Sequence, residues 1–77
     1  MQIGQAKEYF DLGVITGFTV TPRPMGKGYY LGIEGKEGKR WVLETKVGEV
    51  KVFASLDTLV GQVKLITGDI KYLTIRI

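Results

Sequence analysis

Near the start of the chain, apolar residues recur at the spacing of an α-helix. Ile3, Ala6 and Phe10 stand at positions i, i+3 and i+7, so a helix would carry them on one face. Gly13 follows as the expected C-terminal cap, because glycine adopts the left-handed conformation that often ends helices. The pattern therefore predicts a short helix over residues 3–12.

Four segments further along are rich in β-branched and aromatic residues, which are typical of β-strands. They cover residues 14–21, 29–34, 40–45 and 50–54. A loop rich in Pro and Gly follows the first, and glycine-containing turns separate the others. Connections this short predict a meander of antiparallel strands. A last alternating stretch, residues 70–77, predicts one further strand.

The longest helical pattern lies between the fourth and fifth predicted strands. Its apolar stripe has the spacing of an amphipathic helix and consists of Leu56, Leu59, Val60, Val63 and Ile66. Ser55 is the expected N-cap, and Gly68 is expected to close the helix. The order α-β-β-β-β-α-β predicts a single α+β domain over residues 1–77. We expect an antiparallel sheet of four to five strands, one main helix packed on a face, and the short N-terminal helix.

Alternation along the strands assigns their side chains to two faces of the sheet. The main helix is expected to cover the face that holds Phe18, Val20, Leu31, Ile33, Trp41, Leu43, Val50, Val52, Leu73 and Ile75. The opposite face is expected to hold Ile15, Tyr30, Val42, Phe53, Ile70 and Tyr72 among Thr19, Arg40, Glu44, Lys51, Thr74 and Arg76. A solvated antiparallel face is mostly polar, and this one is mixed. It is therefore covered by the N-terminal helix, paired with a second subunit, or used for binding.

The composition removes most catalytic chemistry. The chain has no Cys, no His, no Asn and one Ser, so neither a Ser-His-Asp nor a Cys-His site can form. That single Ser55 is assigned to the helix cap, and the carboxylates are scattered over turns and strands. The glycine-rich stretches 26–28 and 35–39 lead into strands, whereas a phosphate-binding P-loop opens a helix. We therefore expect no enzyme activity, no cofactor and no metal.

Charge is the compositional feature that indicates a partner. The formal net charge is +3, and the excess lies between residues 22 and 51, where seven Lys and Arg face four Glu. Basic residues interleaved with aromatics on an open sheet are typical of nucleic-acid-binding surfaces, since rings stack on bases and cations hold phosphates. The predicted phosphate contacts are Lys36, Lys39, Lys46 and Lys51, with secondary contacts from Arg23, Tyr30 and Arg40. The expected partner is DNA or RNA. The alternative is a protein-interaction or homodimerisation module that binds no nucleic acid.

The first residues, Met1 to Lys7, do not form the basic and apolar pattern of a secretory leader. No apolar run in the sequence is long enough to span a membrane. We therefore expect a cytoplasmic protein without membrane attachment.

The stretch from Tyr29 to Ile66 carries a resemblance to known domains. It contains a glycine turn, Arg40-Trp41-Val42-Leu43-Glu44, a second glycine turn, Val50-Lys51-Val52-Phe53, and Ser55-Leu56-Asp57-Thr58 opening a helix. This order resembles the three-strand-plus-helix DNA-binding domains of plant ethylene-response factors and of the arm-binding regions of tyrosine-recombinase integrases. The resemblance implies a sheet that enters the major groove, with contacts from Arg40, Glu44, Lys46 and Lys51 and phosphate contacts from Lys36 and Lys39. The element order also resembles the single-strand-binding coactivator family called positive cofactor four, which dimerises.

Overall fold

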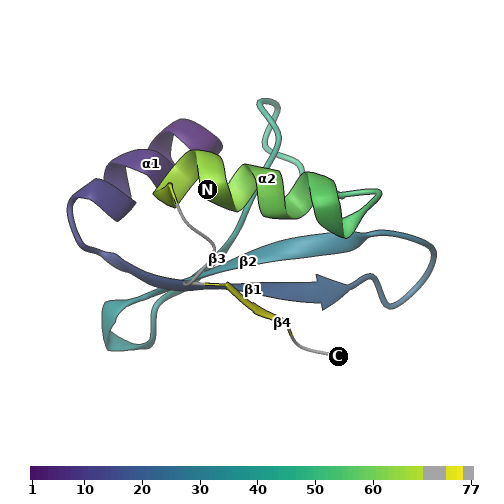
Figure 1. The fold of residues 1–77 in the computed structure, drawn as a ribbon, viewed down its shortest axis with the longest axis horizontal. Coiled ribbons are helices and arrows are strands. Elements are labelled where there is room, and N and C mark those ends of the chain that lie inside the picture. The colour runs from purple at the N-terminus through teal and green to yellow at the C-terminus, as the bar shows by residue number, and fades with distance from the viewer. Residues whose placement is uncertain (69–72, 76–77) are drawn as a thin grey trace.

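The described part of the chain folds into one sheet with two helices packed on the same face of it (Figure 1). The computed structural model describes residues 1–68 and 73–75. The described elements are α1 (Ile3–Asp11), β1 (Ile15–Pro22), β2 (Tyr29–Gly35), the short 3-10 helix η1 (Lys36–Gly38), β3 (Arg40–Val42), α2 (Leu56–Thr67) and β4 (Leu73–Ile75). Both predicted helices are confirmed, and with the sheet they form a small α+β unit.

The strand order across the sheet is β3-β2-β1-β4. β1 pairs antiparallel with β2, and β2 pairs antiparallel with β3, as the short connections predicted. β4 instead runs parallel to β1, with Phe18 opposite Leu73. A parallel neighbour requires a crossover connection, and α2 lies in that connection. The described strands therefore form a three-stranded antiparallel sheet extended by a parallel strand, and not an antiparallel sheet of four to five strands.

No regular strand forms over the predicted residues 50–54: the chain leaves the sheet as a hairpin and returns to β2 at Phe53. Only isolated bridges occur here, between Glu44 and Val50 and between Tyr29 and Phe53. The Lys51 N–H donates to the Leu43 carbonyl at 2.9 Å and closes the base of the hairpin. This segment, residues 43–51, rises on the helix side of the sheet (the teal loop at the top of Figure 1). The strand predicted over residues 40–45 consequently ends at Val42.

The core lies between the two helices and one face of the sheet. The predicted face residues Phe18, Val20, Leu31, Ile33 and Leu43 are all buried, and α2 contributes Leu59, Val63 and Ile66. Trp41 and Leu73 are partly buried against this cluster. The predicted positions of Ile70, Tyr72 and Arg76 lie outside the described residues.

Two residues predicted for the opposite face belong to the core. Ile15 is buried because a register shift between Ile15 and Gly17 reverses the side-chain alternation at the start of β1. Phe53 is buried, whereas Val50 and Val52 are 44% and 43% exposed. The alternation of residues 50–54 is thus shifted by one position from the prediction, and a one-residue shift exchanges the two faces.

Local capping groups set the ends of α2 as predicted. The Ser55 hydroxyl accepts a hydrogen bond from the Thr58 N–H at 3.3 Å. Gly68 ends the helix in the left-handed conformation at φ 80°, and its N–H donates to the Lys64 carbonyl. Gly13 has a similar positive φ of 76° just beyond α1.

The first residue is bound to the end of β3. The Met1 ammonium group donates to the Val42 carbonyl at 3.0 Å and lies 3.1 Å from Glu44 Oε1. The Glu44 N–H donates in turn to the Met1 carbonyl at 2.8 Å. Glu44, predicted on the face opposite the main helix, therefore pairs with the N-terminal residue, whose side chain belongs to the core.

Candidate nucleic-acid interface

The face of the sheet turned away from α1 and α2 carries the candidate site (Figure 1). Strand register places Thr19, Gly32 and Val42 in one row across β1, β2 and β3. Thr21 lies beside Tyr30 toward one end of this row, and Glu34 lies between Gly17 and Arg40 toward the other. We call these eight residues the open face: Gly17, Thr19, Thr21, Tyr30, Gly32, Glu34, Arg40 and Val42.

The middle of the open face carries short side chains. Thr19 is buried, and its hydroxyl occupies the space that a Cβ on Gly32 would need. Because Gly32 has no side chain, the Thr19 hydroxyl can lie close to the Gly32 backbone. Tyr30 and Val42, on the same face, are half-buried.

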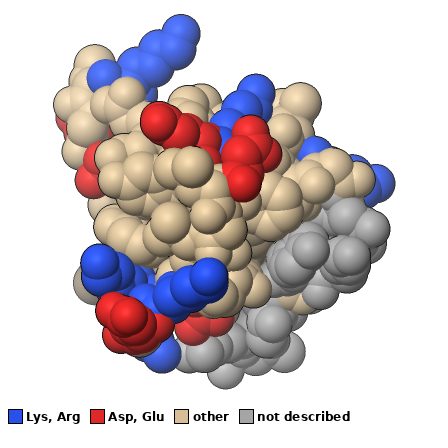
Figure 2. Space-filling view, turned by 90° about the vertical axis from the view of Figure 1, so that its left-hand side faces the viewer, with Lys and Arg blue, Asp and Glu red and all other residues tan. Residues whose placement is uncertain are grey.

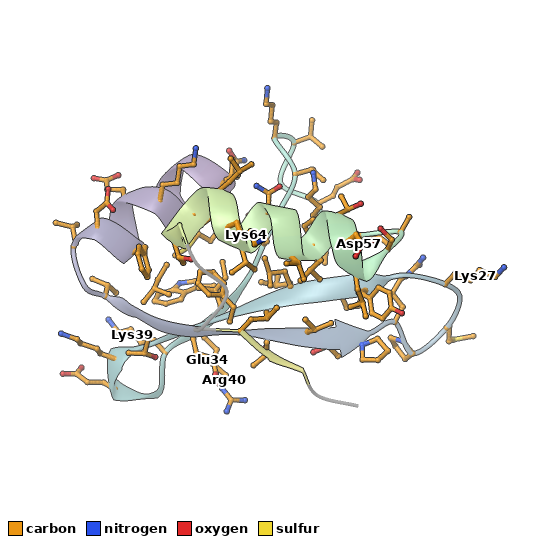
Figure 3. The ribbon with its side chains drawn as sticks, viewed as in Figure 1. Lys27, Glu34, Lys39, Arg40, Asp57 and Lys64 are labelled. Atoms are coloured by element: carbon orange, nitrogen blue, oxygen red, sulfur yellow. The ribbon has the colours of Figure 1, made fainter. Side chains whose placement is uncertain are left out.

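One end of the open face is basic because β2 turns into β3 through η1. Lys36 and Lys39 are exposed on this turn, which the Gly35 N–H closes by donating to the Lys39 carbonyl at 2.8 Å. Arg40 follows directly, and its side chain is 69% exposed. Figure 3 shows Arg40 and Glu34 projecting together from the face away from the helices.

Acidic residues lower the positive charge at this end. Glu34 Oε2 lies 3.7 Å from Arg40 Nη2, and the Glu34 side chain is 30% exposed. Glu37 is on η1 itself, in the left-handed conformation at φ 62°. In a space-filling view of this end of the molecule, Lys and Arg lie next to Asp and Glu (Figure 2). Three cations against two carboxylates leave a local excess of one positive charge.

The other end of the open face is the loop between β1 and β2. Arg23 is half-buried there, and its Nη1 donates to the Lys27 carbonyl at 3.1 Å. Its N–H donates to the Gly28 carbonyl at 3.1 Å, so Arg23 holds the loop together from inside. Lys27 is exposed and points outward beyond the end of the sheet (Figure 3).

Sequence reasoning selected Arg23 and missed Lys27. Lys27 stands between Gly26 and Gly28, both of which have positive φ, 103° and 110°. A lysine between two such glycines lies at the tip of a tight loop, where its side chain must face solvent. That local signal was present in the sequence.

The remaining two predicted contacts lie on the hairpin of residues 43–51. The Lys46 carbonyl accepts a hydrogen bond from Gln2 Nε2 at 3.1 Å, which ties that part of the hairpin to the start of α1. Lys51 Nζ lies 5.5 Å from the ring centroid of the buried Phe53. Of the seven predicted residues, Tyr30, Lys36, Lys39 and Arg40 share the open face and its basic turn, whereas Arg23, Lys46 and Lys51 do not.

The described residues offer little to other kinds of site. They enclose no pocket, and nowhere in residues 1–68 and 73–75 do three His, Cys, Asp or Glu side chains gather as metal ligands would. Neither α1 nor α2 is long and apolar enough to cross a membrane.

No family model matches this chain, and no curated protein sequence or solved structure is similar to it. The resemblance to three-strand-plus-helix DNA-binding domains thus stays a prediction from the sequence pattern.

Proposed function

We propose that the protein binds nucleic acid, without catalysis, through the open face and the basic residues at its two ends. One observation carries the proposal: both helices pack on the same face of the sheet, and neither covers the face with Tyr30 and Arg40 (Figure 1). An aromatic ring and a cation on such a face offer the two contacts that nucleic acids use, base stacking and phosphate pairing.

The separation of the basic residues favours a long anion over a small one. β2 has seven residues, so at about 3.3 Å per residue it spans roughly 20 Å. Lys36 and Lys39 stand at one end of this strand, and Lys27 stands near the other. A ligand that reaches both ends needs negative charges repeated along its length, as a phosphodiester backbone has.

The proposal is tested by titrating the protein into labelled oligonucleotide at about 50 mM salt, where phosphate contacts are strongest. The informative variant is K36Q/K39Q, which removes two lysines from the turn beside the open face. K7Q/K64Q is the matched control, since Lys7 and Lys64 are exposed on α1 and α2 and the net charge falls from +3 to +1 in both variants.

We expect the wild type to bind, the affinity to fall as salt rises, and K36Q/K39Q to bind more weakly than K7Q/K64Q. Each lost phosphate contact should reduce the slope of log K against log salt by about 0.7 for a single strand or 0.9 for a duplex. No binding by the wild type at this salt would exclude the proposal. Equal loss in both variants would mean that net charge, and not the open face, attracts the oligonucleotide.

The alternative function is self-association through the same face. Tyr30 and Val42 favour it, because half-buried apolar side chains on an uncovered sheet face can pack against a second copy. Sedimentation distinguishes the two. A stable dimer that binds no oligonucleotide would support self-association and exclude nucleic-acid binding. A monomer that binds oligonucleotide would exclude self-association.

A further inference from the structure

The width of the sheet decides which form of nucleic acid the open face can accept. Thr74, Thr19, Gly32 and Val42 are cross-strand partners in a single row over β4, β1, β2 and β3. With neighbouring strands about 4.8 Å apart, the backbones of the outer strands are roughly 14 Å apart. The major groove of B-form DNA is about 12 Å wide and admits a helix or a two-stranded ribbon. The parallel strand β4 makes this face too wide to lie flat in the groove.

The chemistry of the open face also differs from that of a surface that only follows a duplex backbone. Its middle row carries no charge in β1, β2 and β3, and the exposed lysines lie beyond the strand ends. A duplex turns its phosphates outward and hides the faces of its bases. It could therefore use the end lysines but not the neutral middle of the sheet.

Tyr30 supplies what a single strand needs. Its side chain makes no hydrogen bond or ring contact within the described residues, whereas the Tyr9 ring packs against Trp41 with ring centroids 6.0 Å apart. Its neighbours on the open face are the short residues Thr21 and Gly32. A partly exposed ring without such contacts, next to short residues on a sheet face, is typical of the platforms on which unpaired bases stack.

We infer that the ligand of the open face is single-stranded nucleic acid, with a base stacked on Tyr30 and phosphates held by Arg40 and the lysines at the two ends. This inference rests on the proposed function. It names the form of nucleic acid, and it replaces the insertion into a major groove that the sequence resemblance implied.

The test compares a labelled single strand of about 12 nucleotides, as DNA and as RNA, with a hairpin duplex of the same sequence, at about 50 mM salt. Three proteins are used: the wild type, Y30L and Y30F. Leucine keeps an apolar side chain at the half-buried position but removes the aromatic face, and phenylalanine keeps that face without the hydroxyl. Circular dichroism and Trp41 fluorescence verify that each variant is folded.

We expect the wild type to bind at least one of the two single strands about tenfold more tightly than the duplex. The Y30L substitution should lower the affinity for the single strand about tenfold and the affinity for the duplex little. Y30F should bind both with the affinity of the wild type. Equal binding of single strand and duplex, or equal losses on both in Y30L, would overturn the single-strand inference and leave the proposed function standing. A wild type that binds neither form would overturn both.

Discussion

Gly35 ends β2 where the backbone passes close to the indole ring of Trp41. A Cβ added at Gly35 would lie 2.6 Å from Trp41 Cζ3 and 3.2 Å from the Val14 carbonyl oxygen. The constraint is steric, because the φ of this residue, −123°, is one that any amino acid adopts. The glycine is therefore required by the packing of the tryptophan and not by the turn that follows.

We expect G35A to lower the free energy of unfolding by about 2 kcal/mol, because the ring and the neighbouring strand must move to admit the methyl group. Urea denaturation followed by Trp41 fluorescence measures it. Gly4→Ala on α1 is the control, since a Cβ there meets no atom within 4 Å. A G35A protein as stable as the wild type would show that the indole ring shifts freely.

The helix α2 contains one glycine, Gly61, and is ended by another, Gly68, and the two have opposite roles. Gly61 lies in the helix interior, is exposed, and has no atom within 4 Å of an added Cβ. Gly68 lies at the end with φ 80°, where an L side chain is strained. Replacing glycine by alanine should therefore change the free energy of unfolding in opposite directions at these two positions.

We expect G61A to raise the free energy of unfolding by about 1 kcal/mol, because alanine loses less backbone entropy in a helix than glycine does. G68A should lower the free energy of unfolding by about 1 kcal/mol. Thermal unfolding followed by circular dichroism at 222 nm compares the two variants. A destabilising G61A would indicate that the exposed side of α2 contacts something beyond the described residues.

At the scale of the whole molecule, the position of a charge is expected to affect binding more than the net charge of +3 does. The open face places Glu34 next to Arg40, with 3.7 Å between Oε2 and Nη2. Glu8 lies exposed on α1, in the helical layer. Neutralising either carboxylate raises the net charge equally, from +3 to +4.

If nucleic acid binds the open face, E34Q should increase the affinity about threefold, which is about 0.6 kcal/mol and typical of one exposed ion pair. E8Q should change it less, because its carboxylate is on the far side of the sheet. Anisotropy titrations at low salt give both values. Combining E34Q with R40Q should remove the gain, and a gain that survives in the double variant would show that Glu34 does not act through Arg40.

The elements of this protein could be predicted from short-range patterns because their causes are short-range. The spacing of Ile3, Ala6 and Phe10 predicted α1, and Ser55 and Gly68 marked the ends of α2. The alternation in β1 and β2 predicted most of the buried face. The sequence also predicted that Lys36, Lys39 and Arg40 lie close together at a turn, since all three fall within five consecutive residues.

Long-range packing decided the rest, because the sequence pattern is compatible with more than one arrangement. Alternation in residues 50–54 suits either face, and the burial of Phe53 selects one of them. A register shift between Ile15 and Gly17 buries Ile15, although plain alternation along β1 places this residue on the opposite face. The parallel position of β4 and the placement of both helices on one face depend on contacts between distant segments. Those contacts leave the open face uncovered by the helices. The basic character of the chain is therefore evident from its sequence, whereas the existence of an uncovered sheet face beside the basic residues depends on the tertiary structure.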